Sequence, residues 1–172
     1  MKPRILKNAF AAAFLTLALI GVATTGYAQK HESLTPLLID QEGWTADTAE
    51  GMSMDMGAMK MVTASRTYAQ GEKEIDVVIM IGNQAMTQGK MQEMKMESSD
   101  GSVTTSEIDG FQVQTIYDKK GDSSSLVVYL AQSPTAGALL VICGEGLSGK
   151  EMLNMAKKFD WKAMKAAAQK LL

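Results

Sequence analysis

A long stretch of alternating apolar and polar residues, interrupted by turn-forming residues, most strongly limits how this chain can fold. Between residues 59 and 143 the pattern is mostly of period two, with apolar side chains at alternate positions, which is the period of a β-strand with one buried face. The clearest run is Ile75, Val77, Ile79 and Ile81. Most connections are of hairpin length, whereas parallel crossovers need about a dozen or more residues. The sequence therefore predicts an antiparallel meander of about six strands.

Turn signals divide this stretch into separate strands. Asp109-Gly110 is typical of a tight two-residue hairpin turn, and Ser98 to Gly101 is a second strong turn signal. Val78 and Met80 make the second face of their strand apolar, as expected for a central strand covered on both sides. Strands are expected at residues 59–68, 74–81, 91–97, 103–108, 111–117, 126–131 and 138–143.

The C-terminal segment has a helical pattern. Ser148 followed by Glu151 is a capping box, which satisfies the unpaired amides at a helix start. Met152, Met155 and Phe159 recur at helical spacing, and Asp160, which follows, is placed to cap a second helix. The expected fold class is α+β, with a C-terminal helix, kinked or divided in two, packed on one face of the sheet.

The first 28 residues predict export. Three basic residues, Lys2, Arg4 and Lys7, precede an apolar run of about 14 residues, which is too short for a membrane-spanning helix. Gly26 and Ala28 supply the small residues of a cleavage site after Ala28. We expect a periplasmic protein with a secretory signal peptide at 1–28, a partly flexible leader at 29–41 and a single α+β domain at 42–172.

Charge and cysteine content exclude some classes of partner. The chain has 17 basic and 19 acidic residues, and loss of the three basic signal residues changes its formal charge from −2 to −5. Binding to nucleic acid requires a clustered positive surface, so this balance argues against such a partner. Cys143 is the only cysteine, so no internal disulfide forms. Because it ends an apolar run, we expect it to be buried; the alternative is a reactive or intermolecular thiol.

A glycine-rich segment resembles a nucleotide site only superficially. Residues 144–149 match G-x-G-x-x-G, and Lys150 extends the match toward a phosphate-binding loop. That loop, however, needs a hydroxyl residue where this chain has Glu151, and the dinucleotide fold needs further strand–helix units. We therefore interpret the segment as a strand-to-helix turn and expect no nucleotide.

Methionines suggest a metal site. Five of them lie within ten residues, and an extended backbone would place Met52, Met54 and Met56 on one face. Gly57 and Ala58 would allow a bend that brings the next two methionines nearby. Thioether sulfur is soft and neutral, so it suits Cu(I) and Ag(I). Packing in the core or a flexible surface loop is the alternative explanation. The candidate ligands are Met52, Met54, Met56, Met59 and Met61.

His31 suggests a second form of copper binding. Cleavage after Ala28 would make His31 the third residue of the new terminus. A free α-amine, two backbone amides and an imidazole then offer Cu(II) or Ni(II) a square-planar set of four nitrogens. The alternative is a solvated histidine in a terminal tail.

No catalytic constellation is visible in the sequence. His31 is the only histidine, so Ser-His and Cys-His pairs and histidine-based zinc sites are absent from the remainder of the chain. Carboxylates at Glu93, Glu97, Asp100, Glu107 and Asp109 have no distinctive spacing. We therefore predict a non-enzymatic protein that binds copper. The alternative is a module that binds an envelope protein, or a membrane surface through its basic C-terminal helix.

Overall fold

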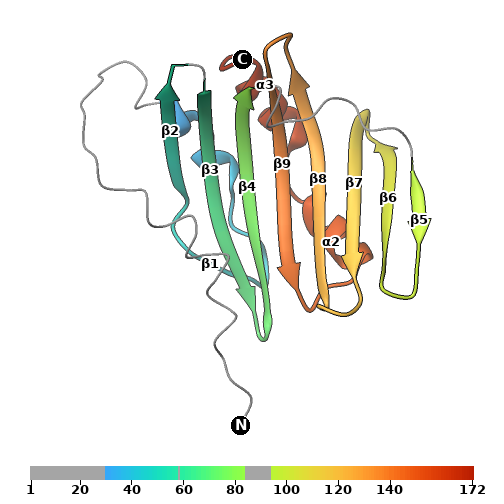
Figure 1. The fold of residues 1–172 in the computed structure, drawn as a ribbon. Helices are drawn as coiled ribbons and strands as arrows, with labels where there is room; N and C mark the ends of the chain where they lie inside the picture. The colour runs from blue at the N-terminus through green and yellow to red at the C-terminus, as the bar shows by residue number, and fades with distance from the viewer. Residues whose placement is uncertain (1–29, 58, 84–93) are drawn as a thin grey trace.

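The computed structural model describes residues 30–57, 59–83 and 94–172, and these fold into a single nine-stranded antiparallel sheet with helices on one face (Figure 1). The strand order is β1-β3-β4-β9-β8-β7-β6-β5, with β2 also paired to β3. The expectation of about six strands was wrong, whereas the antiparallel pairing is confirmed. The strands are β1 (Thr45–Ala46), β2 (Glu50–Met56), β3 (Met59–Gln70), β4 (Lys73–Asn83), β5 (Lys95–Glu97), β6 (Gly101–Ile108), β7 (Phe111–Asp118), β8 (Ser123–Gln132) and β9 (Ala136–Glu145).

The alternation in the sequence determines which side chains enter the core. On β4, Ile75, Val77 and Ile79 are fully buried, while Glu74 and Asp76, which flank Ile75, are exposed. Successive side chains of a strand point to opposite faces, so each strand contributes every second residue to the core. The period-two prediction is confirmed for this strand, which lies in the middle of the sheet.

The turn between β6 and β7 explains the register of that hairpin. Asp109 and Gly110 have φ angles of 52° and 80°, the left-handed pair that a tight two-residue hairpin requires. They bring Ile108 opposite Phe111, so the predicted turn between β6 and β7 is confirmed. The strands that the sequence analysis did not anticipate, β1 and β2, both pair with β3 and extend the sheet beyond it.

The C-terminal residues form two helices, α2 (Gly149–Ala156) and α3 (Trp161–Gln169). Ser148 and Glu151 cap α2 reciprocally, and Asp160 caps α3 by accepting from the amide of Ala163 at 2.9 Å. Both predicted caps are confirmed. The buried residues of these helices belong to the same apolar cluster as the strands: Met152, Met155, Ala156, Trp161, Met164 and Ala168. Figure 1 shows both helices behind the sheet; we call this the core face and the opposite side the open face.

The N-terminal segment also lies against the core face. It forms two 3-10 turns, η1 (His31–Ser33) and η2 (Thr35–Leu37). Leu34 and Leu38, within the region predicted to be a partly flexible leader, are almost completely buried in the core cluster. Tyr68 donates a hydrogen bond to the carbonyl of Ile39 at 2.9 Å, and Arg66 donates to that of Leu38 at 2.6 Å. These bonds hold the segment to β3.

Several predictions need correction or lie outside the described residues. Val78 and Met80 are half-buried on the open face, and within the described ranges α2 and α3 lie only on the core face. A sheet covered on both sides was therefore the wrong expectation for that part of the chain. The signal peptide, Gln29, Ala58 and residues 84–93 are outside the described ranges. No helix in the described part of the chain is long and apolar enough to cross a membrane.

Candidate functional site

The hairpin of β2 and β3 brings the five clustered methionines onto one face. Met54 pairs directly with Met61, Met56 pairs with Met59, and Met52 pairs with Thr63. Residues directly opposite in an antiparallel pair share a face, as do residues two apart along a strand. All five therefore lie on the same face, and we call them the hairpin methionines. This is the open face, because Val62 on the same strand points into the core.

The hairpin methionines are accessible to different extents. Met52 and Met59 are each 42% exposed and Met56 is 59% exposed, whereas Met54 is half-buried and Met61 is only 7% exposed. Exposure is greatest at Met56, next to the turn, and least at Met61, on the inner strand of the hairpin. A soluble ion can therefore approach the thioethers near the turn, while Met61 is held in place by its surroundings.

Contacts on either side of the hairpin turn align its two strands. Gly57 has a φ of 68°, a left-handed value that favours glycine. Its amide donates to the Asp55 carboxylate at 3.1 Å. Asp55 and Lys60, paired across the strands on the face opposite the methionines, form a salt bridge at 3.4 Å. These contacts fix the register that aligns Met54 with Met61 and Met56 with Met59.

The spacing of these side chains suits a shared ligand. Directly opposite side chains in an antiparallel pair have Cβ atoms roughly 4.5–5.5 Å apart, and diagonal neighbours are about 7–8 Å apart. Methionine has three rotatable bonds before its sulfur-bound methyl group, so four sulfur atoms from two adjacent pairs can converge on one ion. Met54, Met61, Met56 and Met59 form such a set, and Met52 is the next neighbour along β2.

His31 lies on the other face of β2, away from the hairpin methionines. Its Nδ1 is 3.2 Å from Oγ of Ser53, and Ser53 pairs with the buried Val62 of the core face. A Cβ added at Gly51 would meet the Cβ and Cγ of His31 at 2.7 Å, so the absence of a side chain there makes room for the imidazole. The two predicted copper elements thus lie on opposite faces of β2.

Other metal-binding or catalytic groups do not assemble in the described residues. Within the described ranges, no three His, Cys, Asp or Glu side chains are placed to hold a metal ion. The candidate carboxylates Glu97, Glu107 and Asp109 are exposed, and Asp100 pairs with Lys120 at 2.9 Å; Glu93 is outside the described residues. The described structure therefore brings no pair of these carboxylates together as a recognisable site.

In the glycine-rich segment before α2, the capping interaction between Ser148 and Glu151 already uses the groups at the helix start. The Glu151 carboxylate accepts from the amide of Ser148 at 2.9 Å and from Nζ of Lys73 at 2.8 Å. The hydrogen bond from Lys73, followed by those from Ser148, lowers the pKa of Glu151 to about 2. At neutral pH this carboxylate is ionised, and its negative charge at the helix start repels a phosphate. This arrangement favours the interpretation of the segment as a turn.

Cys143 is exposed on the open face, which corrects the prediction that it is buried. The apolar run at residues 139–143 alternates between faces: Leu140 and Ile142 enter the core, while Cys143 lies between Asp76 on β4 and Ser125 on β8. Neighbouring side chains partly desolvate the thiol, and this desolvation, together with the Asp76 carboxylate, raises the pKa of Cys143. The thiol is therefore accessible but kept protonated.

The centre of the open face carries a row of uncharged side chains. Met80, Leu139 and Tyr129 lie side by side on β4, β9 and β8, and Val78, Val141 and Val127 form a second row beside them. All are half-buried except Leu139, which is 9% exposed. Aromatic residues and methionine, with few charges, are typical of the centre of a protein interface. We call these six residues the open-face rows.

Comparisons with known proteins give no relative for this chain. No protein-family model matches it, and no curated protein or solved structure matches it either. Its function must therefore be inferred from its own residues.

Proposed function

We propose that this is an exported, non-enzymatic periplasmic protein that binds Cu(I), or Ag(I), through its hairpin methionines. The observation that supports the proposal is the pairing of Met54 with Met61 and Met56 with Met59 on one accessible face. Thioether ligands prefer soft monovalent ions, and acid does not protonate the sulfur, so protons do not compete with the metal. Export rests on the signal-peptide pattern of residues 1–28.

Packing in the core explains the hairpin methionines less well than metal binding does. Met52, Met56 and Met59 are each at least 42% exposed, so they contribute little buried area to the core. By contrast, Met152 and Met164 on the helices are fully buried and are explained by packing alone. Three exposed methionines on one hairpin face therefore call for an explanation other than the stability of the core.

Competition with a chromogenic chelator would test the proposal. Leucine at positions 54, 56, 59 and 61 keeps the apolar volume but removes the sulfur atoms. The quadruple variant should bind Cu(I) at least about tenfold more weakly, and Met52→Leu should have a smaller effect. The matched control is Met94→Leu with Met96→Leu, because these methionines are also exposed but lie on or beside β5, at the other edge of the sheet. Equal affinity in the quadruple variant and the control would refute the thioether site.

Binding of Cu(II) at the amino terminus is a separate part of the proposal. After cleavage before Gln29, His31 would complete the four-nitrogen set. Its imidazole must then exchange the contact with Ser53 for the metal. The mature protein should show a visible Cu(II) absorption band that is lost in His31→Ala, and a precursor that retains Met1 should lack it. A band that persists in His31→Ala would contradict this part of the proposal.

A docking function is the second candidate, favoured by the open-face rows. An envelope partner bound there would protect Tyr129 and Met80 from surface labelling in cells, compared with the purified protein. Equal labelling in both settings would exclude this use of the face. Docking to membranes through α3 is less favoured, because Trp161, Met164 and Ala168 are buried. Failure to sediment with anionic vesicles is the expected result for that test.

A further inference from the structure

A third strand adds a methionine to the open face beside the hairpin. Met80 of β4 pairs with Thr63 of β3, and Thr63 pairs on its other side with Met52 of β2. Met61 lies two residues before Thr63 on the same face, so it is the diagonal neighbour of both methionines. Thioethers from all of these strands therefore lie around Thr63, and we call Met52, Met61 and Met80 the inner methionines.

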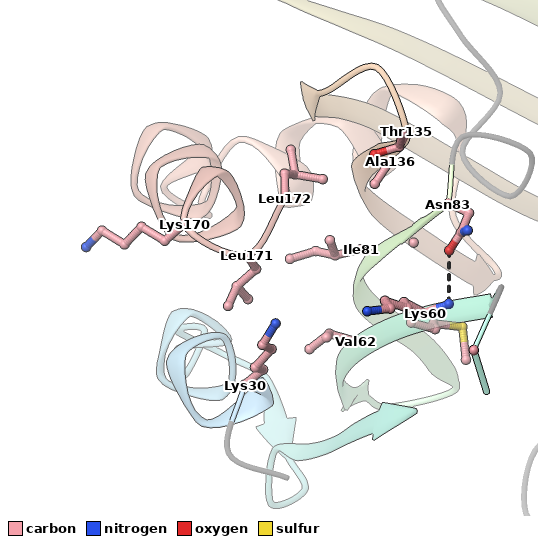
Figure 2. Close-up of a pocket in the computed structure, with 13 residues that line it drawn as sticks. Lys30, Lys60, Val62, Ile81, Asn83, Thr135, Ala136, Lys170, Leu171 and Leu172 are labelled. Atoms are coloured by element: carbon pink, nitrogen blue, oxygen red, sulfur yellow. Dashed lines mark hydrogen bonds between the residues drawn. The ribbon is translucent and has the colours of Figure 1, made fainter. Parts of the chain in front are cut away.

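The direction of two of these side chains follows from their neighbours in the core. Figure 2 shows Val62 and Ile81 directed toward Leu171, across a cavity of about 560 Å³ at this end of the sheet. Successive side chains of a strand point to opposite faces. Met61 and Met80 immediately precede Val62 and Ile81 in the chain, so both point to the open face.

A glycine leaves space between the Met61 and Met80 side chains. Gly82 pairs with Met61 and lies two residues from Met80 on the same face, and both Gly82 and Met61 also line the cavity at this end of the sheet. No β4 side chain therefore stands between the two thioethers. Met61 is 7% exposed, Met80 is half-buried and Met52 is 42% exposed, so an ion can approach the buried Met61 from the side of Met52.

The spacing allows one ion to contact all the inner methionines. Diagonal neighbours in an antiparallel pair have Cβ atoms roughly 7 Å apart. The right-handed twist of adjacent strands shortens the diagonal that joins the two residues nearer the N-terminal ends, and both Met52–Met61 and Met61–Met80 are diagonals of this kind. Because each sulfur lies beyond Cβ on a flexible chain, the sulfurs of Met52 and Met80 can both reach an ion beside that of Met61.

The surroundings of the inner methionines favour a soft ion. Met80 pairs with Thr63 on one side and Leu139 on the other, and these paired neighbours offer neither a carboxylate nor an imidazole, which harder divalent ions prefer. Met80 is also the one large apolar residue of β4 that is not β-branched, since the others are all valine or isoleucine. Strand propensity therefore does not account for a thioether at this position.

We propose that the inner methionines form a second site for Cu(I) or Ag(I), separate from a site near the turn. Met56 pairs with Met59, and Met54 is the diagonal neighbour of Met59, so these three thioethers stay together when Met61 binds the inner ion. The inference deepens the copper proposal: it rests on thioether binding by this face, but it assigns a further ligand, Met80, and a second ion.

Native mass spectrometry during titration with Ag(I) would count the ions. Ag(I) also binds thiols, so the parent and every variant carry Cys143→Ser. Met80→Leu keeps the apolar volume and should bind one ion fewer than the parent. Met52→Leu, at an exposed position where the fold is not at risk, should lose the same ion. Met56→Leu with Met59→Leu should instead lose the ion near the turn.

The matched control is Met155→Leu, the same substitution in the core cluster, which should bind as many ions as the parent. Methyl NMR of methionine-labelled protein identifies the ligands, because the Met52 and Met61 signals should shift with the ion that Met80→Leu removes. Far-ultraviolet circular dichroism establishes that each variant is folded.

The outcomes separate this inference from the copper proposal. If Met80→Leu and Met52→Leu bind as many ions as the parent, or if the Met80 methyl signal does not shift, the second site is refuted and the site near the turn still stands. If the parent binds no ion, both proposals fail. If an ion is lost in Met80→Leu but not in the Met56 and Met59 double variant, the inner site is supported by itself.

Discussion

The same strands form both faces of the sheet, but the two faces differ in burial and in the residue types they carry. On the core face, Ile79 of β4 and Leu140 of β9 are fully buried in the apolar cluster that also includes residues of the helices. One residue along each strand, on the open face, Met80 is half-buried and Leu139 is 9% exposed, and the hairpin at the edge exposes Met56. Branched aliphatic residues with few rotamers make up much of the core face, whereas flexible thioethers gather on the open face. Residues that stability does not require are therefore available for binding.

Methionine itself illustrates the contrast. Met152 and Met164 on the helices are fully buried in the core cluster, where an adaptable side chain fills irregular space. Met52, Met56 and Met59 on the hairpin are largely exposed. One residue type thus serves packing on one side and presents sulfur to solvent on the other, and only its position in the fold distinguishes the two.

The largest expected effect comes from truncating a core methionine. Met164→Ala should lower the free energy of unfolding by about 2–5 kcal/mol, because it removes buried atoms and leaves a cavity. Met56→Ala, at a position 59% exposed, should change it by less than about 0.5 kcal/mol. Urea denaturation followed by circular dichroism measures both. A similar loss of unfolding free energy in both variants would contradict the contrast between the two faces.

A glycine on β2 should show a strong dependence on His31. Gly51→Ala places a Cβ within 2.4 Å of the imidazole Cδ2, so the ring and η1 must shift, at a cost of about 1–3 kcal/mol. The double variant with His31→Ala should recover most of this loss, because the overlap is then removed. A double-mutant cycle measured by denaturation gives the coupling; additive effects would show that His31 does not lie over β2.

The cap of α2 should give a smaller effect that depends on pH. Because the folded protein lowers the pKa of Glu151 from 4.5 to about 2, its contribution is complete above about pH 4.5 and is lost as the pH falls toward 2. Glu151→Gln should therefore be less stable than the parent at pH 7, with a difference that closes between pH 4.5 and 2. Glu107→Gln, at an exposed strand position, is the control. A difference that does not vary with pH would exclude the ionised cap.

The smallest effect on stability is expected at Cys143, where reactivity is the useful measurement. Desolvation and the Asp76 carboxylate raise the pKa of the thiol, so its alkylation by iodoacetamide should require a higher pH than that of an ordinary cysteine. Asp76→Asn should move the midpoint of the rate–pH profile to lower pH, and Asp109→Asn, in a distant turn, should not. An unchanged profile in Asp76→Asn would show that the carboxylate does not act on the thiol.

Turn and cap patterns in the sequence predicted most of the elements, but the number of strands was underestimated. Asp109-Gly110, Ser148 with Glu151, and Asp160 were recognised correctly, since turns and caps depend on a few neighbouring residues. The strand β2 was missed, although Met52-Ser53-Met54-Asp55-Met56 alternates as a strand does. The segment was expected to be extended but not to pair in the sheet, because Gly51 and Asp55 belong to residue types that are depleted in strands.

Burial on the second face could not be predicted from the run at residues 139–143. Five consecutive apolar residues suggest a strand buried on both sides, and this led to the wrong prediction for Cys143. Whether the second face of a strand is covered depends on where the helices settle, which sequence periodicity does not specify. Likewise, Lys30, Lys60 and Leu172 are far apart in the sequence and line one cavity only because of tertiary packing.

The sequence by itself determined the antiparallel strands, the turns, the helix caps and the fact that Met52, Met54 and Met56 share a face, because each follows from the backbone geometry of neighbouring residues. Only the tertiary structure decided that Met59 and Met61 join that face, that His31 lies behind it, and that Cys143 is exposed. These outcomes depend on which strands pair and which face the helices cover. Such long-range contacts are selected by the burial of the core as a whole, and no local pattern encodes them.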